Sequence, residues 1–151
     1  MTVVRRGTAR IDAGGAGSAQ GPYRAELISD TAGLTQFGAF IEELPPGSRS
    51  SFSHWHATED EMVLILDGTL TENGVETILS PGDAACWRAG DPVAHSMYNH
   101  ADTVVRYVVI GTRVTHDTVT YPDHDRVLRY DRTTNTRRYT TLDGQPADKP
   151  G

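Results

Sequence analysis

The stretch Gly47-Ser-Arg-Ser-Ser-Phe-Ser-His54-Trp-His56-Ala-Thr-Glu-Asp-Glu61-Met-Val-Leu-Ile-Leu-Asp-Gly68 carries the strongest structural and chemical signal in this chain. One residue separates His54 from His56, and Glu61 follows five residues later. Because successive side chains of a β-strand point to opposite faces, the two histidines share one face. Imidazoles and a carboxylate that converge can bind a divalent metal ion. The working hypothesis is therefore a metal site built on this stretch.

The parity of the strand decides which side chains can reach such a metal. Phe52, His54 and His56 fall on the same face. Glu61 is an odd number of positions from His56, so a straight strand would put it on the opposite face. Residues 57–60 must therefore turn the chain, and Glu61 begins the next strand.

Three neighbouring acids compete for the carboxylate position. Glu59 and Asp60 directly precede Glu61. We favour Glu61 as the ligand because it shares its strand face with Val63 and Ile65, which are expected to face the core. Glu59 and Asp60 are expected to be acids of the turn.

A further histidine, His95, lies in a later apolar run, where it shares a face with Met97 and Asn99. Three imidazoles and one carboxylate from three neighbouring strands can meet inside a β-barrel. That set leaves one or two coordination positions for water or substrate, as a catalytic metal requires. Apolar residues on the ligand-bearing faces are expected to line the pocket: Phe52, Val63 and Met97.

The region from residue 23 to residue 112 predicts an all-β fold. Short runs of alternating apolar and polar residues are separated by turn residues, and Asn73-Gly74 is the strongest hairpin signal. No segment of this region shows the caps and periodicity of a helix. Such spacing is typical of a β-sandwich or small barrel. The predicted strands are 23–29, 35–44, 50–56, 61–66, 69–79, 83–87, 93–99 and 103–112.

Two motifs in this region resemble those of the cupin superfamily. The first is Gly47-x6-His54-x-His56-x4-Glu61-x6-Gly68, and the second is Gly82-x5-Arg88-x-Gly90-x4-His95-x3-Asn99. The resemblance covers roughly residues 35–112. It implies a jelly-roll barrel that is usually dimeric, with four metal ligands: His54, His56, Glu61 and His95.

The second motif departs from the usual cupin pattern in the turn before His95. Arg88 stands where proline is usual, and four residues instead of two separate Gly90 from His95. More narrowly, the chain is similar to a group of small bacterial cupins generally described as uncharacterised. Their tails share a Tyr-Pro-Asp stretch and an Asp-Gly-x-Pro stretch, which begin here at Tyr121 and Asp143.

The chain divides into three parts on this evidence. Residues 1–22 form an N-terminal arm, poor in residues that could be buried, and residues 23–112 form the cupin barrel. Residues 113–151 form a polar tail that packs on the barrel or on a partner. A solvated wrap is the simpler interpretation of this tail, and a lid or a dimer-clasping arm is the alternative.

Two of the predicted strands are apolar on both faces. In 61–66 the outward side chains are Met62, Leu64 and Leu66, and 103–112 also presents apolar residues outward. An apolar outer face is commonly covered by a second sheet or by another subunit. The sequence therefore predicts a homodimer.

Most other residues of potentially reactive types are expected to have structural roles. Cys86 lies in an Ala-Ala-Cys-Trp strand and is expected to be a small core residue, and Asn99 to hold a turn. Trp55 points away from the ligands and is expected to pack. Tyr107 is a weak candidate for an acid or base near the metal. The remaining histidines are expected to be solvated: His100, His116 and His124.

The charge composition argues against some classes of binding partner. The formal net charge is −6, and no basic block precedes the tail, which does not favour nucleic-acid or anionic-membrane binding. The start of the chain lacks a secretory signal, and the apolar runs are too short to span a bilayer. A cytoplasmic protein that binds a small molecule is expected.

The leading functional hypothesis is a metal-dependent enzyme that acts on a small organic molecule. The ligand set suits one divalent ion of Fe, Mn, Ni, Cu or Zn, and ligand type alone does not choose among them. The resemblance allows dioxygenase chemistry or Lewis-acid isomerase, lyase or hydrolase chemistry. A non-catalytic sensor or carrier that binds metal and a small ligand is the alternative, and a metal-free structural barrel is a third.

Overall fold

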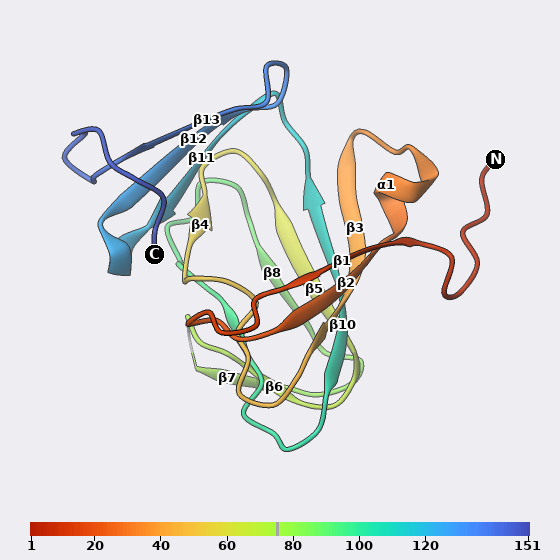
Figure 1. Ribbon diagram of the computed structural model, residues 1–151. Helices are drawn as coiled ribbons and strands as arrows, with labels where there is room; N and C mark the ends of the chain where they lie inside the picture. The colour runs from red at the N-terminus through yellow and green to blue at the C-terminus, as the bar shows by residue number, and fades with distance from the viewer. Residues whose placement is uncertain (75) are drawn as a thin grey trace.

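The computed structural model describes residues 1–74 and 76–151, which form a jelly-roll β-sandwich (Figure 1). The predicted all-β fold is confirmed, although the described strands form open sheets and no closed barrel. The largest sheet has six strands, in the spatial order β1 (Arg10–Gly14), β2 (Tyr23–Leu27), β3 (Phe37–Leu44), β10 (Val105–Thr112), β5 (Glu61–Asp67) and β8 (Ala84–Trp87).

Two smaller sheets complete the described fold. The second has the order β13 (Thr136–Thr140), β12 (Arg126–Asp131), β11 (His116–Tyr121) and β4 (Trp55–His56). The third has the order β7 (Thr77–Leu79), β6 (Leu70–Glu72) and β9 (Met97–Tyr98). β6 and β7 flank the predicted Asn73-Gly74 turn, and Val75 of the predicted 69–79 segment lies outside the described residues.

The hydrophobic core lies on the inner face of the six-stranded sheet. Along β5 and β10, alternate side chains are buried, as the period of two requires. The inner side chains pack with residues of the third sheet into one cluster: Leu44, Val63, Ile65, Leu70, Leu79, Met97, Val105, Tyr107 and Val109. This packing fixes β5 and thereby the position of Glu61 at its first residue.

A short helix, α1 (Ile28–Ala32), contradicts the prediction that residues 23–112 contain none. The helix has no side-chain hydrogen bond at its N-cap, and contacts with the rest of the fold stabilise it. The buried hydroxyl of Ser29 accepts a hydrogen bond from the Ala39 amide at 2.7 Å, and Asp30 forms an ion pair with Arg113. Gly33 then ends the helix in the left-handed conformation, with φ of 74°.

The N-terminal arm contains the exposed strand β1, which pairs with β2 from Arg10↔Leu27 to Gly14↔Tyr23. Its order comes from main-chain pairing, which needs no apolar side chains. The C-terminal tail is not a solvated wrap. Its three strands form a sheet beside β4, at the upper left of Figure 1, and they bury Val119 and Leu128.

Two predicted strands are much shorter than the sequence indicates. Of residues 50–56 only β4 is a strand, and of residues 93–99 only β9 is one. Cys86 is exposed on the outer face of β8, so its assignment to the core is wrong. It pairs with Met62 across the outer face, whereas its neighbour Trp87 turns inward.

The described part of the chain holds no helix with the length and apolar character that crossing a bilayer requires.

Candidate metal centre

His54 and His95 are brought together by an isolated antiparallel bridge. The amide of each donates to the carbonyl of the other, at 3.1 Å from His54 and 2.9 Å from His95. Their rings lie with centroids 5.2 Å apart. The pairing of two short segments that are 41 positions apart thus places two of the predicted ligands side by side.

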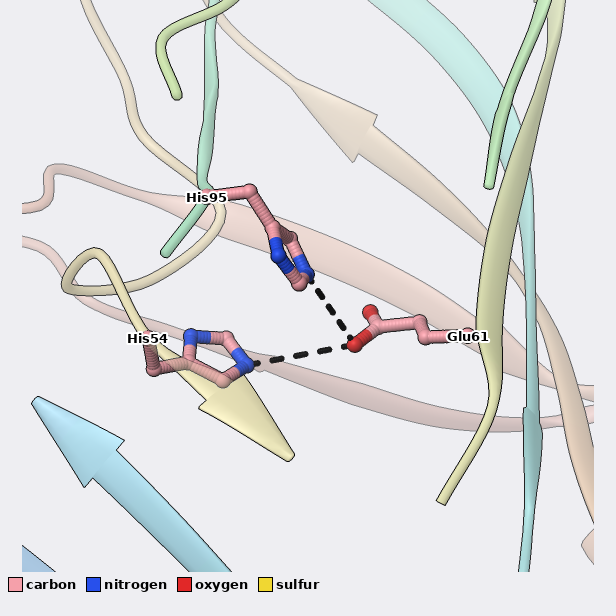
Figure 2. A group of neighbouring side chains, drawn as sticks. All are labelled: His54, Glu61 and His95. Carbon is pink, nitrogen blue, oxygen red and sulfur yellow. Dashed lines mark hydrogen bonds and ion pairs between the residues drawn. The ribbon is translucent and has the colours of Figure 1, made fainter. Parts of the chain in front are cut away.

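The Nε2 atoms of all three predicted histidine ligands surround one oxygen of Glu61. The distances to Glu61 Oε2 are 3.9 Å from His54, 3.4 Å from His56 and 3.3 Å from His95. Figure 2 shows His54 and His95 reaching this oxygen from different segments. His54, Glu61 and His95 each offer a ligand atom within 4.8 Å of the others.

The other nitrogen of each imidazole has its own acceptor. Nδ1 of His54 lies 2.8 Å from the Phe52 carbonyl, and Nδ1 of His95 lies 3.2 Å from the Val93 carbonyl. Nδ1 of His56 lies 2.6 Å from Asp117 Oδ2. These acceptors place a proton on Nδ1, so Nε2, which faces Glu61, is the nitrogen that a metal would bind.

His54, Glu61 and His95 form one group that could hold a divalent transition metal, and His56 belongs to a neighbouring group with Glu59 and Asp117. Two atoms bound about 2.1 Å from the same ion lie roughly 3.0 to 4.2 Å apart, depending on the angle between them. The three distances to the Glu61 oxygen fall inside this range. Three imidazoles and one carboxylate are also a donor set that such ions prefer.

The surrounding histidines keep the Glu61 carboxylate ionised, as cation binding requires. Burial raises the pKa of Glu61, but hydrogen bonds with His56 and His95 outweigh burial and hold it well below its usual range. Burial lowers the pKa of His54. Burial also acts to lower the pKa of His56, yet Asp117 and Glu61 together raise it to about 9.

Three aromatic or acidic side chains that the motifs do not mark also contact the candidate ligands. Trp87 stacks on His95 with ring centroids 3.7 Å apart and an interplanar angle of 9°. Tyr121 lies against His54 at 5.6 Å between centroids, and Asp117 holds His56. Trp87 reaches the site because the register of β5 and β8 sets it opposite Glu61, a pairing that only the folded sheet decides. The other two come from the tail, where nothing local marks them.

A cavity of about 170 Å³ opens behind the ligands. Val63 and Met97 line it together with His54, Glu61 and His95. Phe52 does not: its ring packs on His124 with centroids 4.0 Å apart. Residues 51–53 form a bend, so the strand parity that placed Phe52 beside the histidines does not apply there. The same contact makes His124 a packed residue and not a solvated one.

The same cavity contains a buried acid, Glu42, that no sequence motif marks. Glu42 on β3 lies opposite Tyr107 on β10, and the Tyr107 hydroxyl donates to Glu42 Oε1 at 2.5 Å. Glu42 is 8% exposed and Tyr107 is fully buried. Burial raises the pKa of Glu42 to about 7, despite the opposing hydrogen bond from Tyr107. Burial also raises the pKa of Tyr107.

A second cavity, of about 250 Å³, also borders the candidate ligands. His54, His56 and Glu61 line it together with two arginines, Arg113 and Arg132. Part of its wall is bare backbone, because two glycines face each other across β3 and β10. A Cβ at Gly38 would lie only 3.1 Å from Nη2 of Arg113, so the arginine occupies the space that a larger residue would need.

Glu59 is not simply an acid of a solvated turn. It is buried, and Arg132 from the tail donates to both of its carboxylate oxygens, at 2.8 and 3.0 Å from Nη2. The Val114 amide also donates to it. Two tail residues thus compensate an acid that would otherwise be costly to bury.

Replacing Arg132 with alanine is expected to lower the free energy of unfolding by about 2 kcal/mol. Glu59 would be left buried without its cation. The loss is smaller than for a fully buried pair because the Arg132 side chain is 31% exposed. Urea unfolding of the metal-free protein measures it, with Arg138→Ala on the exposed part of β13 as the control. Equal unfolding free energies for the two variants would contradict the assignment.

Comparison with solved structures places this architecture in a family. A sugar phosphate isomerase of the cupin superfamily, from Silicibacter pomeroyi, is 33% identical to this chain in sequence, and its structure superposes with a TM-score of 0.77. The alignment covers 85% of this chain and 83% of that one. The chain belongs to the cupin superfamily. A family model described as "Cupin domain" matches residues 40–111, and no curated protein matches the chain in sequence.

Other cupins share the architecture at lower identity. A candidate sugar phosphate isomerase from Acidithiobacillus ferrooxidans is 25% identical, with a TM-score of 0.75, over 85% of this chain and 81% of that one. A predicted oxalate decarboxylase from Thermotoga maritima is 21% identical, with a TM-score of 0.61, over 75% of this chain and all of that one. The second likeness concerns the fold alone.

Proposed function

We propose that this cupin is a metal-dependent enzyme that isomerises a small phosphorylated sugar. The observation that carries the proposal is the convergence of three Nε2 atoms on one Glu61 oxygen. The relative at 33% identity, described as a sugar phosphate isomerase, supports the substrate class.

The metal would be held by His54, His56, Glu61 and His95, which fit one Fe, Mn, Ni, Cu or Zn ion. When bound, such an ion supplies Lewis acidity to a carbonyl or hydroxyl oxygen of the substrate. Trp87 stacks on His95 and keeps that ring in place, while the half-buried Tyr121 lies against the ring of His54. The protein's own contribution is a rigid set of ligands beside a small cavity.

Isomerisation of a sugar moves a proton between neighbouring carbons, and this requires an acid or base in the cavity. Glu42 and Tyr107 form a hydrogen-bonded pair there, in the same cavity as three of the ligands. A carboxyl group with a pKa of about 7 can both accept and return a proton near neutral pH. Glu42 is therefore the proposed proton carrier, and Tyr107 orients it.

Arg113 and Arg132 support an anionic group on the substrate. Both line the cavity that also contains His54, His56 and Glu61, where Arg113 pairs with Asp30 and Arg132 with Glu59. Guanidinium groups bind phosphate oxygens through several directed donors. A phosphorylated sugar could thus place its phosphate near the arginines and its carbonyl end near the ligands.

The alternative is a binding cupin that senses or carries a small ligand without turnover. A binding cupin of this kind requires the metal ligands but does not require a buried carboxyl group beside them. Burying Glu42 without a cation is costly, and structures retain such groups mainly where they serve a function. The Glu42–Tyr107 pair therefore favours the enzyme.

A panel of aldose and ketose phosphates tests the proposal. The protein, with its native metal identified by mass spectrometry in material free of tag-binding metals, is incubated with each sugar phosphate in D₂O. NMR is expected to detect the isomeric sugar and deuterium at the carbon that exchanges its proton. Binding of a sugar phosphate without isomerisation or exchange would favour the alternative instead.

The outer face of the six-stranded sheet supports a homodimer as a further part of the proposal. Met62 and Ile110 are paired there and only half-buried, and Leu66 and Val104 are exposed. Arg106 and Glu43 form an ion pair across β10 and β3, and this mixed charge suits a two-fold pairing of identical surfaces. Light scattering at micromolar concentration is expected to give a dimer mass, and Met62→Asp a monomer mass. A monomer mass for the unchanged protein would refute the pairing.

A further inference from the structure

Asp117 is the point at which the C-terminal sheet contacts the proposed metal centre. Its side chain is only 2% exposed. Oδ2 lies 2.6 Å from Nδ1 of His56, on the side of the ring opposite the Nε2 that approaches Glu61. A carboxylate in this position fixes both the rotation of the imidazole and the location of its proton.

The position of Asp117 is itself fixed by the turn that follows β4. Its other oxygen, Oδ1, accepts hydrogen bonds from the Thr58 hydroxyl at 2.7 Å and the Thr58 amide at 3.1 Å. Next to it, the Ala57 amide donates to the Thr118 carbonyl at 2.9 Å. Both oxygens of the carboxylate are therefore used, and the side chain has little freedom to move.

We propose that Asp117 is a positioning residue that raises the metal affinity of the centre through His56, so that the C-terminal sheet is a working part of this centre. The inference rests on the proposed metal-dependent function. Asp117 lies outside residues 40–111, the part of the chain that the cupin family model matches. Metal affinity is thus controlled from a segment appended to the cupin domain.

The physical reason is that a hydrogen bond to a carboxylate makes the imidazole a better donor. The negative charge of Asp117 polarises the Nδ1–H bond and increases the electron density at Nε2, which faces Glu61. It also prevents the ring from turning away when no metal is bound. A carboxylate in this role typically contributes about 10- to 100-fold in metal affinity.

A double-mutant cycle separates this role from a merely structural one. The dissociation constants of Zn²⁺ and Co²⁺ are measured by competition with a chromophoric chelator for the unchanged chain, Asp117→Ala, His56→Ala and the double variant. Asp117→Ala is expected to weaken binding about 10- to 100-fold in the unchanged background. In the His56→Ala background it is expected to change binding less than about threefold.

Three further variants test whether a loss of affinity comes from misfolding or from a general loss of rigidity. Asp117→Asn keeps the shape and is expected to weaken binding and to shift the visible absorption of bound Co²⁺. Thr58→Val keeps the carboxylate on His56 while removing one donor, and it is expected to bind within about threefold of the unchanged chain. Asp131→Asn is the matched control, because Asp131 contacts only the exposed His116 among the histidines, at 3.4 Å.

The outcomes are distinguishable. Equal losses from Asp117→Ala in both backgrounds, or a loss from Thr58→Val as large as that from Asp117→Ala, would overturn the positioning role. Unchanged affinity in both Asp117 variants would overturn it as well, while the proposed function would stand. An unchanged chain that takes up neither ion would overturn the proposed function and this inference together.

Discussion

A His54→Ala/His56→Ala variant is expected to be purified without the metal ion that the unchanged chain binds at about one ion per chain. The two substitutions remove two of the three Nε2 atoms that surround Glu61 Oε2. His95 and Glu61 alone leave too few donors for tight binding of a transition metal. Elemental analysis by mass spectrometry, before and after attempted reconstitution, measures the loss.

The control is a variant that removes two histidines outside the site. His100 and His116 are exposed and are not among the predicted ligands, so their replacement by alanine should leave metal content unchanged. Stoichiometric metal in neither the unchanged chain nor the ligand variant, after reconstitution, would refute the metal site. Equal metal in both would place the ion elsewhere on the protein.

Glu42→Gln is expected to stabilise the metal-free protein above pH 7 by about 3 kcal/mol. The pKa of Glu42 is about 7 in the folded protein and near 4.5 when the chain is unfolded. Between these values the folded state retains a proton that the unfolded state has released. The contribution of Glu42 to stability is therefore fully present below pH 4.5 and is lost as pH rises through 7.

Glutamine removes this pH dependence because it is neutral and its oxygen can still accept from Tyr107. The unfolding free energies of Glu42→Gln and the unchanged chain should therefore be similar at pH 5 and diverge toward pH 8. Urea unfolding at several pH values measures the difference. Glu43→Gln is the control, because Glu43 lies next to Glu42 on β3 but pairs with Arg106 on the opposite face. Parallel pH profiles for the unchanged chain and Glu42→Gln would contradict the argument.

The same substitution is expected to lower turnover about 10²- to 10⁴-fold, because glutamine cannot carry a proton. Deuterium incorporation from D₂O into the sugar phosphate that the unchanged enzyme converts measures this loss. Undiminished exchange in Glu42→Gln would exclude Glu42 as the proton carrier. A variant that is more stable and less active is the expected result for a group buried for function.

The candidate metal ligands were predictable because their signals are local. His54 and His56 are separated by one residue, and Glu61 begins an apolar strand after a short turn. His95 was found from the spacing of the second motif. The structure brings all four side chains together, with the bridge between His54 and His95 as the decisive contact.

Two of the errors have different local causes: strand parity does not hold outside a strand, and apolar neighbours do not show which way a side chain faces. Phe52 was placed in the pocket by parity, but it lies in a bend and packs on His124. Cys86 was placed in the core from its apolar neighbours, although it faces outward on β8. The length of a strand depends on which segments find pairing partners, and that information is not local.

The sequence by itself determined the all-β class, the core strands and the four candidate ligands. These depend on alternation and spacing within short segments, which the chain carries whatever its surroundings. Only the tertiary structure decided that Glu42 meets Tyr107 inside a ligand-lined cavity and that Asp117 supports His56. Both contacts join residues more than sixty positions apart, from β3 to β10 and from β4 to β11. A carboxylate acquires such a role only from the partner and the burial that folding gives it.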